Sequence, residues 1–62
     1  MSIGNKIREE RRKANLTQGE LANRAGMTTT TIFKIEKSIT DPKWSTVTKI
    51  AAALEIPTAS LL

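Results

Sequence analysis

The sequence contains neither cysteine nor histidine. Disulfide bonds are therefore impossible, and an ordinary zinc site lacks its thiolate and imidazole ligands. The six acidic residues are scattered along the chain and offer no convergent pair for acid–base catalysis. These absences argue against an enzyme, and we expect neither a metal nor any other cofactor.

Long apolar segments are absent as well. No run reaches the roughly 18 apolar residues of a membrane-spanning helix, and the opening residues MSIGNKIREE lack the apolar core of a signal peptide. We therefore expect a soluble cytoplasmic protein with no membrane partner. Phe33 and Trp44 are the only aromatic residues, which argues against a protein that binds single strands by stacking bases on several rings.

Positive charge, by contrast, is in excess. Ten Lys and Arg against six Asp and Glu give a net charge of +4 and a pI near 10.0. On a chain of 62 residues this satisfies the basic-domain criterion for nucleic-acid binding. Many small basic domains are merely soluble, so charge alone leaves both interpretations open. A chain this short forms a single domain, expected over residues 1–62.

Apolar residues recur at spacings of three and four, which predicts helices rather than strands. Ser2, Thr17, Thr28 and Ser45 are typical N-cap residues, and Glu20 follows Thr17 at the spacing of a capping box. We expect an all-α fold of five helices over residues 2–14, 18–25, 29–36, 45–54 and 58–62. The chain stops directly after two leucines, so we also expect it to be a piece of a longer protein.

The segment 29–36 has an outer face that folding does not explain. Ile32 and Ile35 lie three residues apart and face inward. Four other side chains must then point away from the core, namely Thr29, Thr30, Phe33 and Lys34. The run of threonines at 28–31 also forms helices poorly. Something other than helix stability therefore accounts for these residues.

Two short helices joined by a turn that contains glycine match the spacing of a helix-turn-helix, whose second helix enters the DNA major groove. Here Ala22 allows the helices to cross closely, and Gly26 supplies the positive φ of the turn. Helix hairpins are common, so this pattern by itself is only moderately specific.

A longer string is much more specific. The segment IGNKIREERRKANLTQGELANRAGMTTTTIFKIEK, followed by DPKWSTVTKIAAALEI, resembles the phage repressor and Cro type (XRE-like) of helix-turn-helix domain over essentially the whole chain. The resemblance implies a five-helix, lambda-repressor-like DNA-binding domain of a transcriptional regulator, most often a repressor. It further implies a homodimer that binds a palindromic operator in double-stranded DNA, in the prokaryotic cytosol or nucleoid.

The resemblance also assigns residues to DNA contact, namely Gln18, Thr28, Thr29, Thr30, Phe33, Lys34, Lys37 and Lys43. Gln18 takes the position that docks on a phosphate. Thr28 serves both as a helix cap and as a phosphate ligand. Lys37 and Lys43 border a loop that touches the adjacent DNA backbone. The four residues of the outer face, 29, 30, 33 and 34, meet the groove, although for the threonines and Lys34 an ordinary solvated role stays open.

The chemistry of these groove positions favours A·T-rich DNA. Threonine offers a hydroxyl to any base edge and a methyl group to the methyl of thymine, while Phe33 can make only apolar contacts. Lys34 can donate to guanine or hold a phosphate. The family often has glutamine or arginine here, so we expect fewer bidentate base contacts and a partly shape-based specificity.

Other residues are expected to serve the fold. The resemblance implies an ion pair between Arg11 and Glu36 that ties the first helix to the third. Trp44 is interpreted as a packing residue. Ser38 stands where the family commonly has the glycine that ends the third helix, so a positive φ there would carry strain of about 1 kcal/mol.

Three further expectations concern partners. Two copies would place their helices 29–36 in successive major grooves about 34 Å apart. The last helix, ending in Leu61 and Leu62, is the expected dimer surface because an apolar terminus favours a partner. The alternative function is a protein-interaction module on the same fold, such as an antitoxin or adaptor, and an exposed Phe33 suits that reading. The third functional hypothesis, after DNA binding and protein interaction, is a domain that has lost its ligand.

Overall fold

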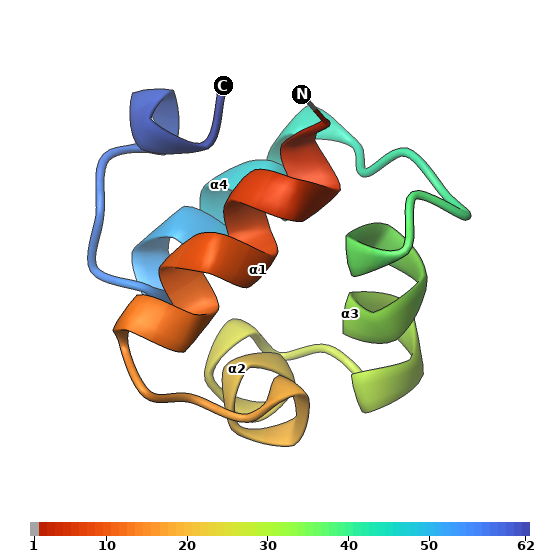
Figure 1. Ribbon diagram of the computed structural model, residues 1–62, viewed down its shortest axis with the longest axis horizontal. Helices are drawn as coiled ribbons and strands as arrows, with labels where there is room; N and C mark the ends of the chain where they lie inside the picture. The colour runs from red at the N-terminus through yellow and green to blue at the C-terminus, as the bar shows by residue number, and fades with distance from the viewer. Residues whose placement is uncertain (1) are drawn as a thin grey trace.

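The computed structural model describes residues 2–62, and Met1, the first residue of the expected domain, lies outside that range. The described residues form α1 (Ile3–Lys13), α2 (Gln18–Ala25), α3 (Thr29–Glu36), α4 (Trp44–Ala53) and a 3-10 helix, η1 (Thr58–Leu61), with no strand among them. In Figure 1, α1 crosses the front of the molecule with α2 below it and α3 to its right, and both chain ends lie at the top. No helix within residues 2–62 is both long and apolar enough to cross a bilayer.

The fold is all-helical, as expected, but the last two helices differ in detail from the prediction. The fifth segment is a short 3-10 helix of four residues, Thr58–Leu61, with Pro57 as its N-cap, rather than an α-helix. The fourth helix begins at Trp44 with Lys43 as its N-cap, so the predicted capping role of Ser45 is wrong. Lys43 is extended and its carbonyl already accepts from the N–H of Val47, which places Ser45 inside the helix.

Every element contributes one large, fully buried side chain to a common core. These side chains are Ile7, Leu21, Ile32, Ile50 and Leu61. Each such burial stabilises the fold by about 1.5–3 kcal/mol. Because Leu61 is part of this core, it cannot also form the predicted dimer surface. Leu62 is 71% exposed and is the only member of the terminal pair left for that role.

The start of α2 and the turn between α2 and α3 both form as the local sequence predicts. Thr17 accepts from the backbone N–H of Glu20, and the Glu20 side chain accepts from the backbone N–H of Thr17, so the capping box is complete. Gly26 has a φ of 70°, and Thr28 Oγ1 accepts from the N–H of Thr31 to cap α3. The threonines of α3 therefore form a helix because its start is capped and its inner face is packed.

All of the α-helices in residues 2–62 end in the same way. After each helix comes a residue with positive φ, namely Asn15, Gly26, Ser38 and Glu55. The next N–H then donates to a carbonyl five residues earlier, from Met27 to Ala22 at 2.8 Å and from Ile39 to Lys34 at 2.9 Å. This hydrogen bond satisfies the helix end and reverses the chain within a short connection. Ser38 does have positive φ, at a cost of about 1–2 kcal/mol relative to glycine.

The start of α1 packs directly on the end of α3. Gly4 is buried, and a Cβ added to it would overlap the carbonyl oxygen of Ile35. Ser38 Oγ donates to Ser2 Oγ at 3.3 Å beside this contact. The small size of Gly4 therefore sets how closely α1 and α3 approach each other.

We predict opposite stability effects for alanine at two glycines. Gly4→Ala should lower the free energy of unfolding by about 1–3 kcal/mol, because the added methyl group displaces α3. Gly19→Ala should raise it by about 0.4–1 kcal/mol, because its Cβ would make ordinary contacts with Thr29 Oγ1 at 3.5 Å and Thr17 Oγ1 at 3.9 Å and alanine restricts the unfolded chain. Urea unfolding of both variants measures the two values. If Gly19→Ala is less stable than the unmodified protein, the space at Gly19 does not accept a methyl group. If Gly4→Ala is equally stable, Gly4 does not limit how closely α1 approaches α3.

Glu20 makes stability depend on pH. Hydrogen bonds from the backbone and side chain of Thr17, with a smaller contribution from Arg24, lower the pKa of Glu20 below its ordinary value of 4.5. A lowered folded-state pKa stabilises the fold above the unfolded-state value, and this contribution is lost as the pH falls through the folded-state pKa.

Glu20→Gln keeps an oxygen acceptor for the cap and removes the charge. The difference in melting temperature between the protein and this variant should therefore be positive at neutral pH and should shrink once the pH falls below 4.5. Thermal melts followed by circular dichroism across this range test it. A difference that stays constant with pH would rule out a contribution from ionised Glu20.

Candidate nucleic-acid interface

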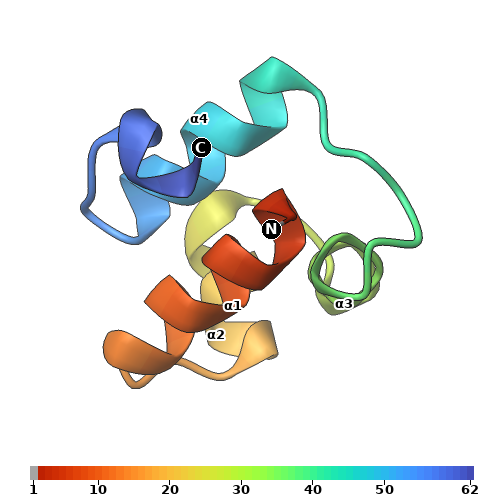
Figure 2. The ribbon, with the colours of Figure 1, turned by 45° about the horizontal axis from the view of Figure 1, so that its top comes forward.

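The helix α3 has two faces of different character. Ile32, Ile35 and Glu36 are buried against the rest of the protein. The side chains that define the outer face of α3 are all exposed, and they are Thr29, Thr30, Phe33, Lys34 and Lys37 at its C-cap. Figure 2 views α3 nearly end-on at the edge of the molecule, so that one side of it is free of other elements. The fold holds α3 by one side and leaves the other accessible.

Hydroxyl groups line the start of the outer face. Thr28 and Thr31 are occupied with each other, since their Oγ1 atoms lie 2.9 Å apart and Thr28 also caps the helix. The hydroxyls of Thr29 and Thr30 make no hydrogen bond within residues 2–62. They remain free to donate to and accept from an external partner.

Phe33 occupies the middle of the outer face. Its side chain is 42% exposed and does not belong to the core. The ammonium group of Lys37 lies 5.9 Å from the centroid of the Phe33 ring, one helical turn further along. Such a cation–π contact at an exposed site contributes about 0.5–1 kcal/mol. It keeps the Lys37 charge on the outer face beside an apolar ring.

Positive charge on this side has no acidic counterpart on α3. The single acidic residue of α3, Glu36, is only 3% exposed and faces inward. On α1, by contrast, cations pair within the helix, with Lys13 3.1 Å from Glu10 and Lys6 4.0 Å from Glu9. Lys34 and Lys37 therefore give the outer face of α3 an uncompensated positive charge.

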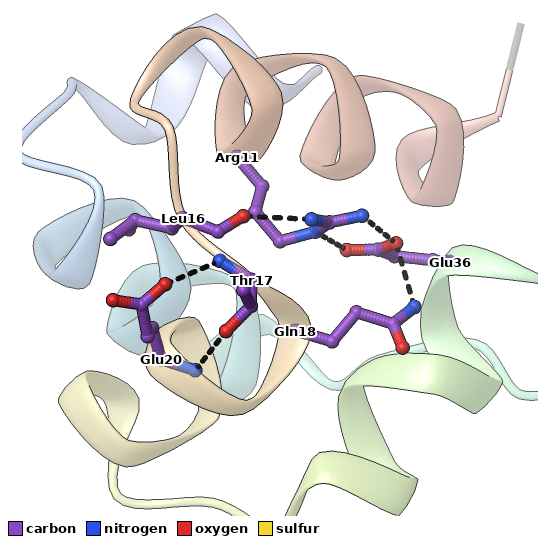
Figure 3. Close-up of polar contacts among 6 residues, drawn as sticks. All are labelled: Arg11, Leu16, Thr17, Gln18, Glu20 and Glu36. Atoms are coloured by element: carbon purple, nitrogen blue, oxygen red, sulfur yellow. Dashed lines mark hydrogen bonds and ion pairs between the residues drawn. The ribbon is translucent and has the colours of Figure 1, made fainter.

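A buried carboxylate joins three helices behind the outer face. Arg11 donates to Glu36 from Nε at 2.7 Å and from Nη2 at 3.0 Å, which is the ion pair that the family resemblance implies (Figure 3). Arg11 Nη1 also donates to the carbonyl of Leu16 at 2.8 Å. Gln18 Nε2 donates to Glu36 at 3.1 Å. These contacts fix α3 relative to α1 and to the first turn of α2.

The remaining candidates lie on either side of α3. Gln18 is the first residue of α2 and is half-buried. The starts of α2 and α3 lie close together, since a Cβ added to Gly19 would be 3.5 Å from Thr29 Oγ1. Lys43 is exposed at the start of α4, and this end of the helix lies at the top of Figure 1, whereas α2 lies at the bottom. The structure thus places Gln18 beside the start of α3 and Lys43 on the opposite side, at the start of α4.

Two features of this region were not anticipated from the sequence. Trp44 is 60% exposed, so its interpretation as a packing residue is wrong. It lies in the first turn of α4, where neighbouring elements no longer cover the helix. The hydrogen bond from Gln18 to Glu36 was also missed. Its partners are 18 residues apart and meet only through the packing of α2 on α3, so no local pattern in the sequence marks it.

The arrangement agrees with known proteins. Residues 7–61 match the HTH_3 family, described as helix-turn-helix. A relative from Bacillus subtilis (strain 168), the uncharacterized HTH-type transcriptional regulator RghRB, is 40% identical over 97% of this chain, which spans 44% of that protein. An uncharacterized HTH-type transcriptional regulator from Methanothermobacter thermautotrophicus is 46% identical over 77% of this chain and 70% of its own length.

Solved structures show the same fold. The restriction-modification controller protein C.AhdI from Aeromonas hydrophila superposes with a TM-score of 0.94 at 27% identity, covering 97% of this chain and 91% of that one. The P22 c2 repressor in complex with a synthetic operator superposes with a TM-score of 0.89 at 27% identity, over 100% of this chain and 94% of that one. Together with the matched residues 7–61, these likenesses show that the chain belongs to the HTH_3 helix-turn-helix family, the phage-repressor type.

Proposed function

We propose that this chain is a DNA-binding domain of a transcriptional regulator and that the outer face of α3 enters the major groove of double-stranded DNA. The observation that carries this proposal is the outer face itself. It presents free hydroxyls, an aromatic ring and two uncompensated lysines on a helix whose opposite side is held in the core. Relatives named as HTH-type transcriptional regulators and a likeness to an operator-bound repressor support the same function.

The dimensions of the groove suit this arrangement. A B-DNA major groove is about 12 Å wide and admits one α-helix. With α3 in the groove, Gln18 at the start of α2 would contact a phosphate on one side. Lys37 and Lys43, which follow α3 along the chain, would contact phosphates on the other. Thr28 remains primarily a helix cap, with its hydroxyl bonded to Thr31.

Sequence preference would come from Thr29, Thr30, Phe33 and Lys34. The free hydroxyls can bond to any base edge, whereas Phe33 favours the C5-methyl group of thymine. Lys34 can reach guanine N7 and O6 or a phosphate. The outer face has no arginine, glutamine or asparagine for bidentate base contacts. We propose A·T-leaning operators read partly through DNA shape.

We further propose that the protein acts as a homodimeric repressor on a palindromic operator. A two-fold dimer with one copy of α3 in each half-site requires half-sites about 34 Å apart, one turn of B-DNA. Since Leu61 belongs to the core, Leu62 is the part of the terminal segment that would contribute to the dimer contact.

A protein-interaction module is the second candidate, because apolar side chains are exposed near α3. Phe33 is 42% exposed and Ile39, just beyond α3, is 62% exposed. The dependence of binding affinity on salt concentration distinguishes the two functions. Binding through phosphates weakens steeply with salt, with a slope in log K of about −0.9 per phosphate contact, whereas apolar protein contacts lack this dependence.

The first test is selection of bound duplexes from a random pool at low and at moderate salt. We expect a palindromic, A·T-rich consensus with half-site centres one helical turn apart, and an affinity that falls steeply as salt rises. Recovery of no consensus at either concentration, or salt-independent binding, would contradict DNA reading by this face.

The second test concerns Phe33 alone. Replacing single thymines in the selected duplex by deoxyuracil removes one methyl group, and at the base that Phe33 covers we expect a loss of about 0.8 kcal/mol, a factor of about four. Phe33→Ala should bind both duplexes equally, and Lys34→Ala is the matched control that should keep the sensitivity. Equal binding of both duplexes by the unmodified protein would show that Phe33 covers no thymine methyl.

A further inference from the structure

Glu36 is the most deeply buried charged residue in residues 2–62, with 3% of its surface exposed, and it accepts more hydrogen bonds than its ion pair requires. The guanidinium of Arg11 already engages both oxygens, with Nε on Oε2 and Nη2 on Oε1. Oε1 accepts a further hydrogen bond, from the side-chain amide of Gln18 at 3.1 Å. An ion pair that only joined α1 to α3 would not need this contact with α2.

The additional hydrogen bond fixes which way the Gln18 amide faces. An ionised carboxylate can only accept, so the amide nitrogen of Gln18 must point toward Glu36. Figure 3 shows the amide oxygen of Gln18 on the side turned away from Glu36. One N–H of Gln18 is therefore used inside the protein, and the second N–H and the oxygen are held in defined directions.

Arg11 makes this arrangement compatible with a nearby anion. A free carboxylate one side chain behind Gln18 would repel a phosphate, but the bidentate pair with Arg11 neutralises Glu36. Both side chains are almost fully buried, with 11% of Arg11 and 2% of Glu36 exposed. The neutral, rigid Arg11–Glu36 pair thus holds the Gln18 side chain in place before DNA binds. This reduces the conformational entropy that Gln18 loses on binding.

We propose that Glu36 is a positioning residue for DNA binding. It orients the Gln18 carboxamide so that the second N–H of Gln18 meets a single DNA phosphate. This inference rests on the proposed DNA-binding function and adds to it a role for Glu36 beyond holding the fold. Glu36 also belongs to α3. The same residue therefore positions both the Gln18 contact with the DNA phosphate and the helix that enters the groove.

The experiment measures affinities of Gln18→Ala, Glu36→Gln and the double variant for the selected duplex, at one salt concentration. Glu36→Gln lets the amide of Gln18 rotate, and we expect both single variants to bind about tenfold more weakly, the scale of one hydrogen bond to a charged group. The double variant should bind no more weakly than Gln18→Ala, because Glu36 acts through Gln18.

Glu20→Gln is the matched control for charge. It removes one negative charge from the exposed first turn of α2, close to Gln18, so that simple electrostatics predicts slightly tighter DNA binding for both Glu→Gln variants. If Glu36→Gln binds more weakly while Glu20→Gln binds equally or more tightly, the result supports the role of Glu36 in positioning Gln18. Circular dichroism verifies that each variant is folded at the temperature of measurement.

Replacing phosphates one at a time by uncharged methylphosphonates locates the contact. At one phosphate we expect the unmodified protein, Gln18→Ala and Glu36→Gln to converge on the same affinity. If Glu36→Gln does not fold, NMR resonances of the Gln18 side-chain amide in the unmodified protein test the same inference. One amide proton should be protected from solvent exchange without DNA, and the other should shift on binding only when that phosphate is charged.

Three results overturn the inference. Glu36→Gln could bind as well as the unmodified protein, its loss could add to that of Gln18→Ala, or its loss could spread evenly over all phosphates, which would leave Glu36 with a structural role only. These results leave the proposed function intact. Failure of the unmodified protein to bind any duplex overturns the proposed function, and the inference with it.

Discussion

The placement of α3 depends on the buried carboxylate of Glu36. Arg11 from α1 and Gln18 from α2 both donate to it, so the three helices meet at one anionic group. Removing one partner of a buried ion pair costs about 3–5 kcal/mol, because the other charge stays buried without compensation. In a core with only one large, fully buried side chain per element, an anchor of this size is a large fraction of the total stability.

Around that anchor, steric constraints complete the orientation of α3. Gly4 lets the start of α1 touch the backbone at the end of α3, and the short turn through Gly26 leaves little freedom between α2 and α3. The helix ends share one geometry, a positive φ followed by a hydrogen bond back to the last turn, which keeps the connections short. The outer face of α3 is accordingly rigid before any partner arrives, and a preorganised surface binds with less loss of entropy.

Features that depend on a few adjacent residues were predictable. The Thr17–Glu20 capping box and the turn at Gly26 follow from residues that act on their own backbone, and the structure contains both. Features that depend on which surfaces meet were predicted less well. Leu61 looked like a free apolar terminus and is part of the core, whereas Trp44 looked like a packing residue and is exposed. Hydrophobicity gives a tendency to be buried but does not say which helix end the neighbours will cover.

The sequence by itself determined the all-helical fold, its helix boundaries to within a few residues, and four side chains on the outer face of α3, namely Thr29, Thr30, Phe33 and Lys34. It could do so because the spacing of apolar residues and the cap residues are local properties of the chain. Only the tertiary structure decided that Gln18 meets Glu36, that Leu61 closes the core and that Gly4 lies on the backbone of Ile35. Those contacts join residues distant in the sequence, and their geometry exists only after the helices have packed.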